Sequence, residues 1–428
     1  MTAPLPPDHH AGRSGAELCP LRLAYLVSHP IQYQAPLLRR VAQEPDIDLT
    51  VLFGSDLSVR GYKDQGFGVE VAWDIPLLEG YRSEFLKPWR DTGSISLTSP
   101  ISRGICRRLR QRDGSPAFDA LWVHGYAGIN SLLAILAANA LGIPVLLRAE
   151  SWLADRVRSR WKLALKQAFF HLLRPGIAAV LPIGTANQAY WTHYFGESVP
   201  QFRMPYAVDN PYFARRAQDS QTRQAELRSE LGIPPGRPVI LFASKLQARK
   251  HADHLLEAYR LFLGSMSSPS THPPAERPFL VIVGDGAERP RLEEMARELR
   301  LGDVYFAGFR NQSELPAFFA LASVFVLPSR HEPWGLIVNE AMAAGCPAIV
   351  STDVGCHYDL ISDGVEGWVF PVGDVEALSA ALRRCFASPQ TAGVMGRNAQ
   401  RRIHSWSYEE DVQGLRQALA CVTGWFRD

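Results

Sequence analysis

Short apolar, β-rich runs alternate with amphipathic helical runs along this chain, and this feature constrains its fold most. Strands and helices alternate in this way when a mostly parallel sheet carries helices on both faces. The rhythm occurs twice, so we expect an α/β protein with two doubly wound domains. The strand-like runs of the first series span 21–27, 48–54, 120–125, 144–150 and 177–184, and those of the second span 239–244, 279–286, 304–309, 323–329 and 347–352.

The chain divides where the rhythm breaks. A linker-like stretch rich in turn residues separates the two series, and 428 residues exceed what one core usually holds. A ligand is expected in the cleft between the domains, at the carboxyl ends of both sheets. The predicted parts are a flexible N-terminal tail over 1–20, an N-terminal domain over 21–206, a C-terminal domain over 207–405, and a last helix over 406–428 that crosses back to the N-terminal domain.

Composition excludes several classes of function. A net charge of +2 argues against a dedicated nucleic-acid-binding protein, which would be strongly basic. No apolar run reaches the length of a membrane span, and the first residues do not read as a signal peptide. The six cysteines form no CxxC pair, which is typical of reduced thiols in a cytosolic protein. We therefore expect a cytoplasmic location.

The stretch HEPWGLIVNEAMAAG, residues 331–345, predicts a sharp turn followed by a helix. Gly335 ends the turn and Leu336 begins good helical sequence. The first backbone N–H groups of a helix have no partner inside it and can bind an anion. Two carboxylates, Glu332 and Glu340, flank this turn and would repel a bare anion. They suit a ligand that carries hydroxyl groups as well as phosphates.

Two lysines follow the first strand of the second series. Lys245 and Lys250 lie in FASKLQARKH, residues 242–251, at the carboxyl end of that strand. Fixed cations at this position can neutralise a diphosphate. A solvated helix start is the alternative. The topology brings these lysines to the same sheet edge as Gly335, which favours a phosphate site.

These motifs resemble those of the retaining glycosyltransferases of family 4, which have the two-domain GT-B fold. The resemblance covers most of the chain and is most specific over 239–374. Glu332 and Glu340 match the E-x7-E motif of the family. Lys245 stands where the family usually has arginine, and Lys250 matches its lysine. In the first domain, DALWVHGYAG resembles the strand that ends in a histidine of the catalytic region, here His124.

The resemblance implies that the C-terminal domain binds a nucleotide-sugar donor and that the N-terminal domain lies on the acceptor side. Lys245 and Lys250 would bind the diphosphate of the donor. Gly335 and Leu336 would add backbone N–H groups. Glu340 would accept hydrogen bonds from the ribose hydroxyls. The donor is a substrate, and no cofactor is implied.

Two residues are implied in catalysis. Glu332 would hold the hydroxyls of the sugar and favour positive charge at its anomeric carbon, while His124 would reach across the cleft toward the same sugar. No motif carboxylate looks placed as a nucleophile, so the two-carboxylate route of retaining glycosidases is not expected. We expect front-face departure of the nucleotide, with stabilisation of the leaving diphosphate as the main catalytic effect. No DxD-like pair precedes the site, so the lysines would replace a metal ion.

The expected function is retaining transfer of a sugar from a nucleotide sugar, most often a UDP-sugar in such families. The acceptor would be a hydroxyl of a lipid-linked glycan, a polysaccharide precursor or a small metabolite. One alternative is a sugar-nucleotide epimerase that shares the GT-B fold. Another is a non-catalytic accessory subunit that binds the donor.

Several stretches depart from the family pattern. SHPIQYQAP, residues 28–36, replaces a common Gly-Gly pair, and its polar side chains are candidates for sugar or acceptor contacts. Residues 61–68 and 73–86 are candidates for the acceptor side. Arg148 and Glu150 either face the cleft or form an ion pair with each other.

The stretch 151–176 combines apolar and basic residues at helical spacing. Trp161, Leu165, Phe169 and Leu173 share one predicted face, and arginines and lysines occupy much of the remainder. One interpretation is a peripheral contact with anionic lipid at the inner face of the membrane. The other is a basic solvent face over the domain core.

Overall fold

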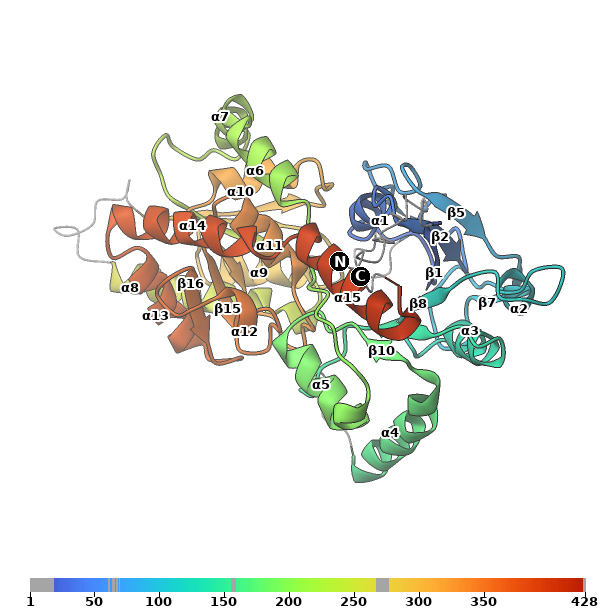
Figure 1. Cartoon of the computed structure of the whole chain (residues 1–428). Coiled ribbons are helices and arrows are strands. Elements are labelled where there is room, and N and C mark those ends of the chain that lie inside the picture. Colours follow the sequence, from blue (N-terminus) through green and yellow to red (C-terminus); the bar gives the residue numbers. More distant parts are fainter. Residues whose placement is uncertain are drawn as a thin grey trace, which may run out of the picture.

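The protein consists of two α/β lobes joined by two crossings of the chain (Figure 1). The computed structural model describes residues 19–60, 62, 63, 66, 68, 70–154, 159–266 and 277–425. The predicted tail over 1–20 lies outside these residues except for its last two. Most of the loop 61–68 and residues 155–158 of the basic stretch also lie outside them.

The N-terminal lobe contains a six-stranded sheet with the order β10-β9-β8-β1-β2-β5. All of its strand pairs are parallel. Its strands are β1 (Leu21–Val27), β2 (Ile47–Phe53), β5 (Arg82–Phe85), β8 (Ala120–His124), β9 (Val145–Arg148) and β10 (Ala179–Val180). Two short ribbons accompany it, β3 (Tyr62–Lys63) with β4 (Glu70–Val71) and β6 (Pro88–Arg90) with β7 (Ile101–Ser102). Its helices are α1 (Ala35–Ala42), α2 (Ile105–Arg108), α3 (Ile129–Ala140), α4 (Arg160–Leu173) and α5 (Thr185–Phe195).

The C-terminal lobe contains a second six-stranded parallel sheet, with the order β13-β12-β11-β14-β15-β16. Its strands are β11 (Val239–Ala243), β12 (Phe279–Val283), β13 (Val304–Gly308), β14 (Val324–Leu327), β15 (Ala348–Ser351) and β16 (Gly367–Phe370). Its helices are α6 (Asn210–Gln218), α7 (Gln221–Glu230), α8 (Ala252–Ser265), α9 (Arg289–Glu298), α10 (Leu315–Leu321), α11 (Leu336–Ala343), α12 (His357–Leu360), α13 (Val375–Cys385) and α14 (Pro389–His404), and α15 (Tyr408–Thr423) follows. The predicted pair of doubly wound domains is confirmed.

Helices cover both faces of each sheet, and this explains the nearly continuous apolar sequence of the central strands. Every residue of β11, β12, β14 and β15 is buried. Apolar side chains alternate between the two faces, so each sheet has a core on either side. The polar residues that the sequence singles out therefore lie at the strand ends.

Helix α15 leaves the C-terminal lobe and packs on the N-terminal sheet, between the two lobes in Figure 1. A capping box formed by Ser407 and Glu410 starts it. Its Leu415 and Leu419 enter the core that contains β1. Arg148, at the end of β9, donates to Asp411 of α15 at 2.8 Å, and both side chains are buried. Arg148 thus pairs with α15, and the Arg148–Glu150 pair weighed from the sequence does not form.

The other crossing is fixed at Tyr206. Its carbonyl oxygen accepts hydrogen bonds from Asn339 Nδ2 and from Trp406 Nε1, each at 2.9 Å. Trp406 stacks on Trp334 with ring centroids 5.5 Å apart. The two crossings are therefore packed against each other and against the start of α11.

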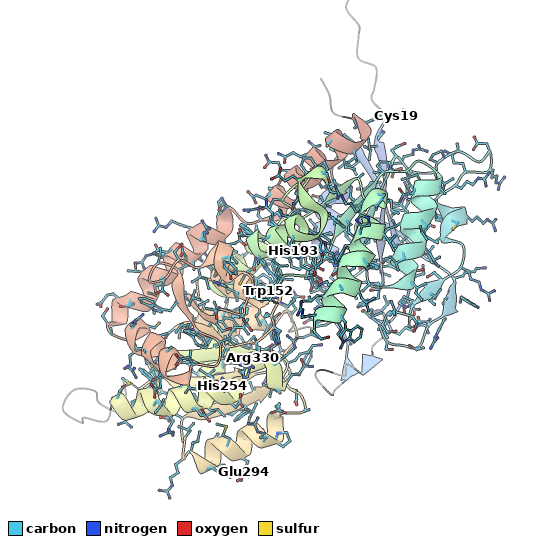
Figure 2. All side chains as sticks on the ribbon, turned by 90° about the horizontal axis from the view of Figure 1, so that it is seen from below. Cys19, Trp152, His193, His254, Glu294 and Arg330 are labelled. Carbon is cyan, nitrogen blue, oxygen red and sulfur yellow. The ribbon has the colours of Figure 1, made fainter. Side chains whose placement is uncertain are left out.

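Direct contacts across the cleft hold the carboxyl edges of the two sheets face to face. Asp359 of α12 accepts hydrogen bonds from the backbone N–H and the hydroxyl of Thr185, at 2.8 and 2.6 Å. Asn311 Nδ2 donates to the carbonyl of Ala72 at 2.7 Å. In Figure 2, seen from below, Trp152 lies where the two lobes meet and Arg330 lies in the C-terminal lobe. The cleft between the lobes is the place where both sets of strand ends meet.

Candidate active site

The turn between β14 and α11 is held open by its glycine. Gly335 has φ +96°, and a Cβ atom there would lie 2.9 Å from Val354 Cγ1. No other residue fits this position without strain. Within the described part of the chain, no hydrogen bond uses the backbone N–H groups of Gly335 and Leu336. These two donors stand at the positive end of α11, as an anion site requires.

Lys250 and Glu332 form the charged centre of the C-terminal wall. Lys250 ends the 3₁₀ turn Ala248–Lys250, and its buried ammonium group pairs with the carboxylate of Glu332. Arg249 Nη1 lies 3.2 Å from the same carboxylate oxygen. Burial alone would raise the pKa of Glu332, but the charges and hydrogen bonds of Lys250 and Arg249 together outweigh burial and hold this pKa low. Burial lowers the pKa of Lys250, and Glu332 opposes that effect.

The structure brings several predicted site residues to one place. Lys250 and Glu332 touch, and Glu332 is three residues from Gly335. Lys245 lies half-buried in the same loop, and its charge contributes to the lowered pKa of Lys250. The predicted neighbourhood of cations and helix N-terminus therefore exists. The sequence did not indicate that Glu332 would be the partner of Lys250.

Glu340 lies on the second turn of α11 and is buried. Burial raises the pKa of this carboxyl to about 8. Among the described residues, no side chain or backbone group forms a hydrogen bond with the carboxyl. A buried carboxyl without a protein partner is costly, and a ligand hydroxyl would satisfy it.

His124 ends β8 on the opposite wall. Its Nε2 lies 3.1 Å from Gln34 Nε2 and 3.5 Å from the hydroxyl of Tyr206. Burial, assisted by the positive charge of Arg148, lowers the pKa of His124 to about 3. The imidazole is therefore neutral near pH 7 and can exchange hydrogen bonds without carrying charge.

Glu150 is a candidate whose role the sequence left open. Its Oε1 accepts hydrogen bonds from the hydroxyls of Tyr33 at 2.7 Å and Tyr206 at 2.5 Å. The same oxygen lies 3.9 Å from His124 Nε2. The Glu150 side chain is 42% exposed, so this fixed carboxylate remains accessible beside His124. In the sequence, the position of Glu150 just after the carboxyl end of β9 was the feature that could have indicated a role in the cleft.

Potential metal ligands gather at the start of α8, directly after Lys250. In the described ranges, His251, Asp253 and His254 at the start of α8 place one ligand atom each within 4.8 Å of the others. Arg291 Nη2 already donates to Asp253 at 3.0 Å. Metal ions are unfavourable beside this arginine and the positive end of α8. Near Lys250 and Gly335 the described residues instead gather positive charge and unbonded backbone N–H groups.

Several known proteins are similar to this chain in sequence, in architecture or in both. Residues 223–402 match the family model described as glycosyl transferases group 1. Alpha-D-kanosaminyltransferase of Streptomyces kanamyceticus is 26% identical over 303 residues, which cover 68% of this chain and 73% of that protein. D-inositol 3-phosphate glycosyltransferase of Saccharomonospora viridis is 31% identical over 212 residues, about half of each chain.

Solved structures agree with the fold. The structure of HepE from Anabaena in complex with UDP and glucose has a TM-score of 0.69 and 18% identity, covering 94% of this chain and 99% of that one. Sucrose-phosphate synthase from Thermosynechococcus elongatus has a TM-score of 0.65 and 18% identity, with 93% and 98% coverage. The two facing parallel-sheet lobes and these neighbours define the GT-B fold. This chain has that fold, and most of its second half matches the model of the glycosyl transferases group 1.

The raised pKa of Glu340 predicts a pH-dependent stability. Between its ordinary value of 4.5 and about 8, the folded chain keeps a proton that the unfolded chain has released. The contribution of Glu340 is therefore full below about pH 4.5 and is lost as the pH rises through about 8. Between about pH 4.5 and pH 8 we expect the free energy of unfolding to fall by on the order of 5 kcal/mol more in the wild type than in Glu340→Gln. Urea unfolding at several pH values measures this, and parallel curves for the two proteins would contradict it.

Proposed function

We propose that this chain is a glycosyltransferase that transfers a sugar from a UDP-sugar to a hydroxyl acceptor with retention of configuration and without a metal ion. The observation that supports the proposal most is the open anion site at Gly335 and Leu336 beside the buried Lys250–Glu332 pair. A bound diphosphate requires hydrogen-bond donors and positive charge, which the backbone N–H groups of Gly335 and Leu336 and the two lysines would supply. The UDP in the HepE structure, which shares the fold, favours uridine as the base.

The ion pair gives the donor site a specific order of events. Before the donor binds, Glu332 neutralises the buried ammonium group of Lys250. A diphosphate arriving at Gly335 would compete for this lysine and leave Glu332 available to the sugar. The carboxylate could then accept hydrogen bonds from sugar hydroxyls and stabilise positive charge at the anomeric carbon. The departing diphosphate would be stabilised by Lys245, Lys250 and the start of α11.

The opposite wall would act on the same sugar. His124 is neutral and held beside Glu150, so we assign both to hydrogen bonding with the sugar or the acceptor. The phosphate oxygen of the leaving nucleotide would take the proton of the acceptor hydroxyl. The attacking oxygen forms the new glycosidic bond on the face from which the diphosphate leaves, so the configuration is retained.

An epimerase would not need an acceptor and would release UDP and free sugar from the donor alone. An accessory subunit would bind the donor and leave it intact. The relatives with transferase names favour transfer over both alternatives.

Helix α4 supports a peripheral contact with anionic lipid. The sequence left open whether Trp161 and Leu165, in the first half of α4, cover a core or contact a membrane. In the structure their exposed fractions are 61% and 60%. Only the last part of α4 is anchored, through Phe170 and Leu173. The helix contains no acidic residue, and Arg160 and Lys162 flank its exposed apolar side chains. Within the described residues, no helix combines the length and apolarity that crossing a bilayer requires.

The first functional prediction separates the two glutamates. Glu340→Gln should weaken the binding of UDP and of UDP-sugar alike, by about tenfold, because a ribose contact is present in both. Glu332→Gln should not weaken UDP binding, because it removes the carboxylate that competes for Lys250, and it should lower turnover by on the order of 10²-fold, because the charge of Glu332 acts on the sugar carbon. Titration calorimetry with UDP and turnover assays on both variants measure these effects. Loss of UDP binding in Glu332→Gln with loss of rate alone in Glu340→Gln would reverse the assignment.

The second concerns metal ions. Turnover should be unchanged by EDTA and by added Mg²⁺ or Mn²⁺, because Lys245 and Lys250 supply the positive charge at the diphosphate. Assays at fixed donor concentration test this directly. Activity that disappears with EDTA and returns with a divalent cation would refute the lysine-based site.

The third concerns α4. Wild-type protein should sediment with phosphatidylglycerol vesicles and not with phosphatidylcholine vesicles, and adding salt should weaken the binding. Trp161→Ser combined with Leu165→Ser should reduce binding about tenfold or more. The matched control combines Val365→Ser with Val394→Ser, two exposed apolar positions of the other lobe. Equal vesicle binding by both double variants would remove α4 from the contact.

A further inference from the structure

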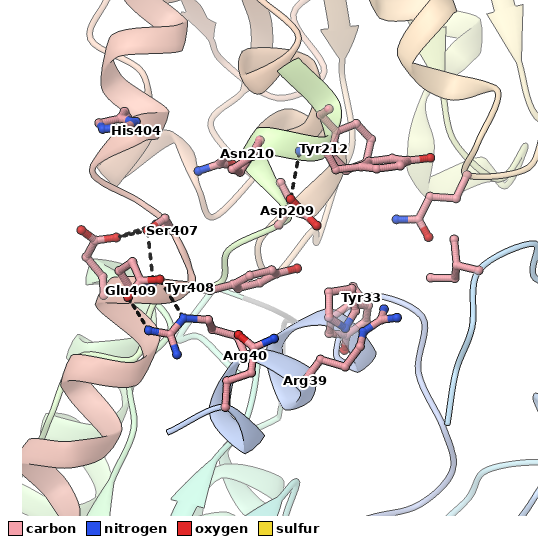
Figure 3. A pocket seen from close by; sticks show the side chains of 18 of the residues that line it. Tyr33, Arg39, Arg40, Asp209, Asn210, Tyr212, His404, Ser407, Tyr408 and Glu409 are labelled. Atoms are coloured by element: carbon pink, nitrogen blue, oxygen red, sulfur yellow. Dashed lines mark hydrogen bonds and ion pairs between the residues drawn. The ribbon is translucent and has the colours of Figure 1, made fainter. Parts of the chain in front are cut away.

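A large cavity lies between the lobes, apart from the residues assigned to the donor. Its volume is about 880 Å³. Helix α1 and the loop at 75–76 line it from the N-terminal lobe, and the start of α6 lines it from the C-terminal lobe. The junction between α14 and α15 closes one side. In Figure 3, Arg39 and Arg40 come from α1, Tyr212 comes from α6 and Tyr408 from α15, while Asp209 directly precedes α6. Neither Lys250 nor Glu332 lines it.

The acidic side chains of this cavity already have partners. Asp209 caps α6 by accepting from the backbone N–H of Tyr212 at 2.9 Å. Glu409 accepts two hydrogen bonds of 2.7 Å from the guanidinium of Arg40. Glu410 belongs to the capping box of α15. The carboxylates of this ion pair and of these two helix caps are therefore already bonded within the wall.

Arg39 is different. In the described part of the chain it forms no hydrogen bond and no ion pair, although it is half-buried in the cavity wall. Its stem packs on Gly80, where an added Cβ atom would lie 2.7 Å from Arg39 Cγ. Gly80 has φ +84°, so this close approach depends on glycine. The stem of Arg39 is therefore held against Gly80, and its guanidinium has no anionic partner among the described residues.

The remaining wall combines neutral polar side chains, among them Gln312, His404 and Ser405, with aromatic and apolar ones. Tyr33 and Tyr408 contribute rings with hydroxyl groups, and Ile75, Pro76 and Pro211 contribute apolar surface. A cavity with one unpaired cation and such a lining matches a small anion that also carries a ring or another apolar part. Tyr33 also donates to Glu150, so the cavity shares a wall with the network around His124.

We propose that this cavity is a second ligand site, distinct from the donor site, for a small organic phosphate or carboxylate bound by Arg39. Both lobes and both crossings form its walls, so a bound molecule fixes the angle between the lobes. The angle between the lobes also sets the distance between the two walls of the donor cleft. Binding in the cavity therefore strengthens nucleotide binding, and the nucleotide strengthens binding in the cavity by the same factor.

Phenyl phosphate and benzoate serve as probes, with benzyl alcohol as the neutral control. Binding is measured by calorimetry in saturating UDP, which blocks the phosphate site of the donor. At least one anionic probe should bind the wild type and benzyl alcohol should not. Arg39→Gln should raise the dissociation constant about tenfold or more, and Arg39→Lys should raise it less. Arg297→Gln, at an exposed arginine of α9, is the matched control, and thermal unfolding confirms that each variant is folded.

Two further results decide the proposal. In the absence of UDP, Lys250→Ala should bind the probe as the wild type does, whereas a probe that occupies the diphosphate site would no longer bind without this lysine. The probe should lower the dissociation constant of UDP in the wild type, whereas competition for one site would raise it. Absence of binding by both anions, or equal binding in Arg39→Gln, overturns the second site, and an unchanged UDP affinity overturns the coupling. Failure of UDP itself to bind would instead count against the proposed function.

Discussion

The structure depends on the packing of its two chain crossings, because the site exists only where two separate sheets face each other. The carbonyl of Tyr206 accepts from Asn339 and Trp406, so one crossing is held by the helix that carries Glu340 and by the other crossing. Arg148 and Asp411 then tie α15 to the end of β9. Breaking one partner of such a buried pair typically costs about 3–5 kcal/mol. The two crossings therefore form one packed unit. This unit sets the relative position of the two cleft walls, which carry His124 and Glu332.

Within the cleft, charge is balanced before any donor binds. Lys250 is buried, and an unpaired buried ammonium group would lose its proton or destabilise the fold. Glu332 prevents this, and its own pKa stays low for the same reason. Glu340 has no such partner, so burial raises its pKa to about 8. Two glutamates of one motif thus have opposite electrostatic environments, which supports giving them different roles toward the sugar and the ribose.

Sequence periodicity predicted the two parallel sheets, because strands buried on both faces must be apolar throughout. It also placed Lys250, Glu332 and Gly335 at one sheet edge, since parallel strands end on the same side. The partners across long sequence separations could not be predicted in this way. Arg148 pairs with Asp411, 263 positions away, and Glu150 binds Tyr33 and Tyr206 instead of Arg148. The apolar face assigned to α4 was only partly a core face, because helical spacing does not reveal whether a neighbour covers it.

In the proposed donor site, a diphosphate takes the place of Glu332 at Lys250. A crystal structure of this chain with UDP would show this exchange. We expect phosphate oxygens within hydrogen-bond distance of Lys250 Nζ and of the backbone N–H groups of Gly335 and Leu336. We also expect the Glu332 carboxylate to lie farther from Lys250 Nζ, so that the ion pair between them is broken or stretched. A UDP molecule bound elsewhere, or one that leaves the Lys250–Glu332 pair intact and Gly335 without a ligand, would contradict this proposal.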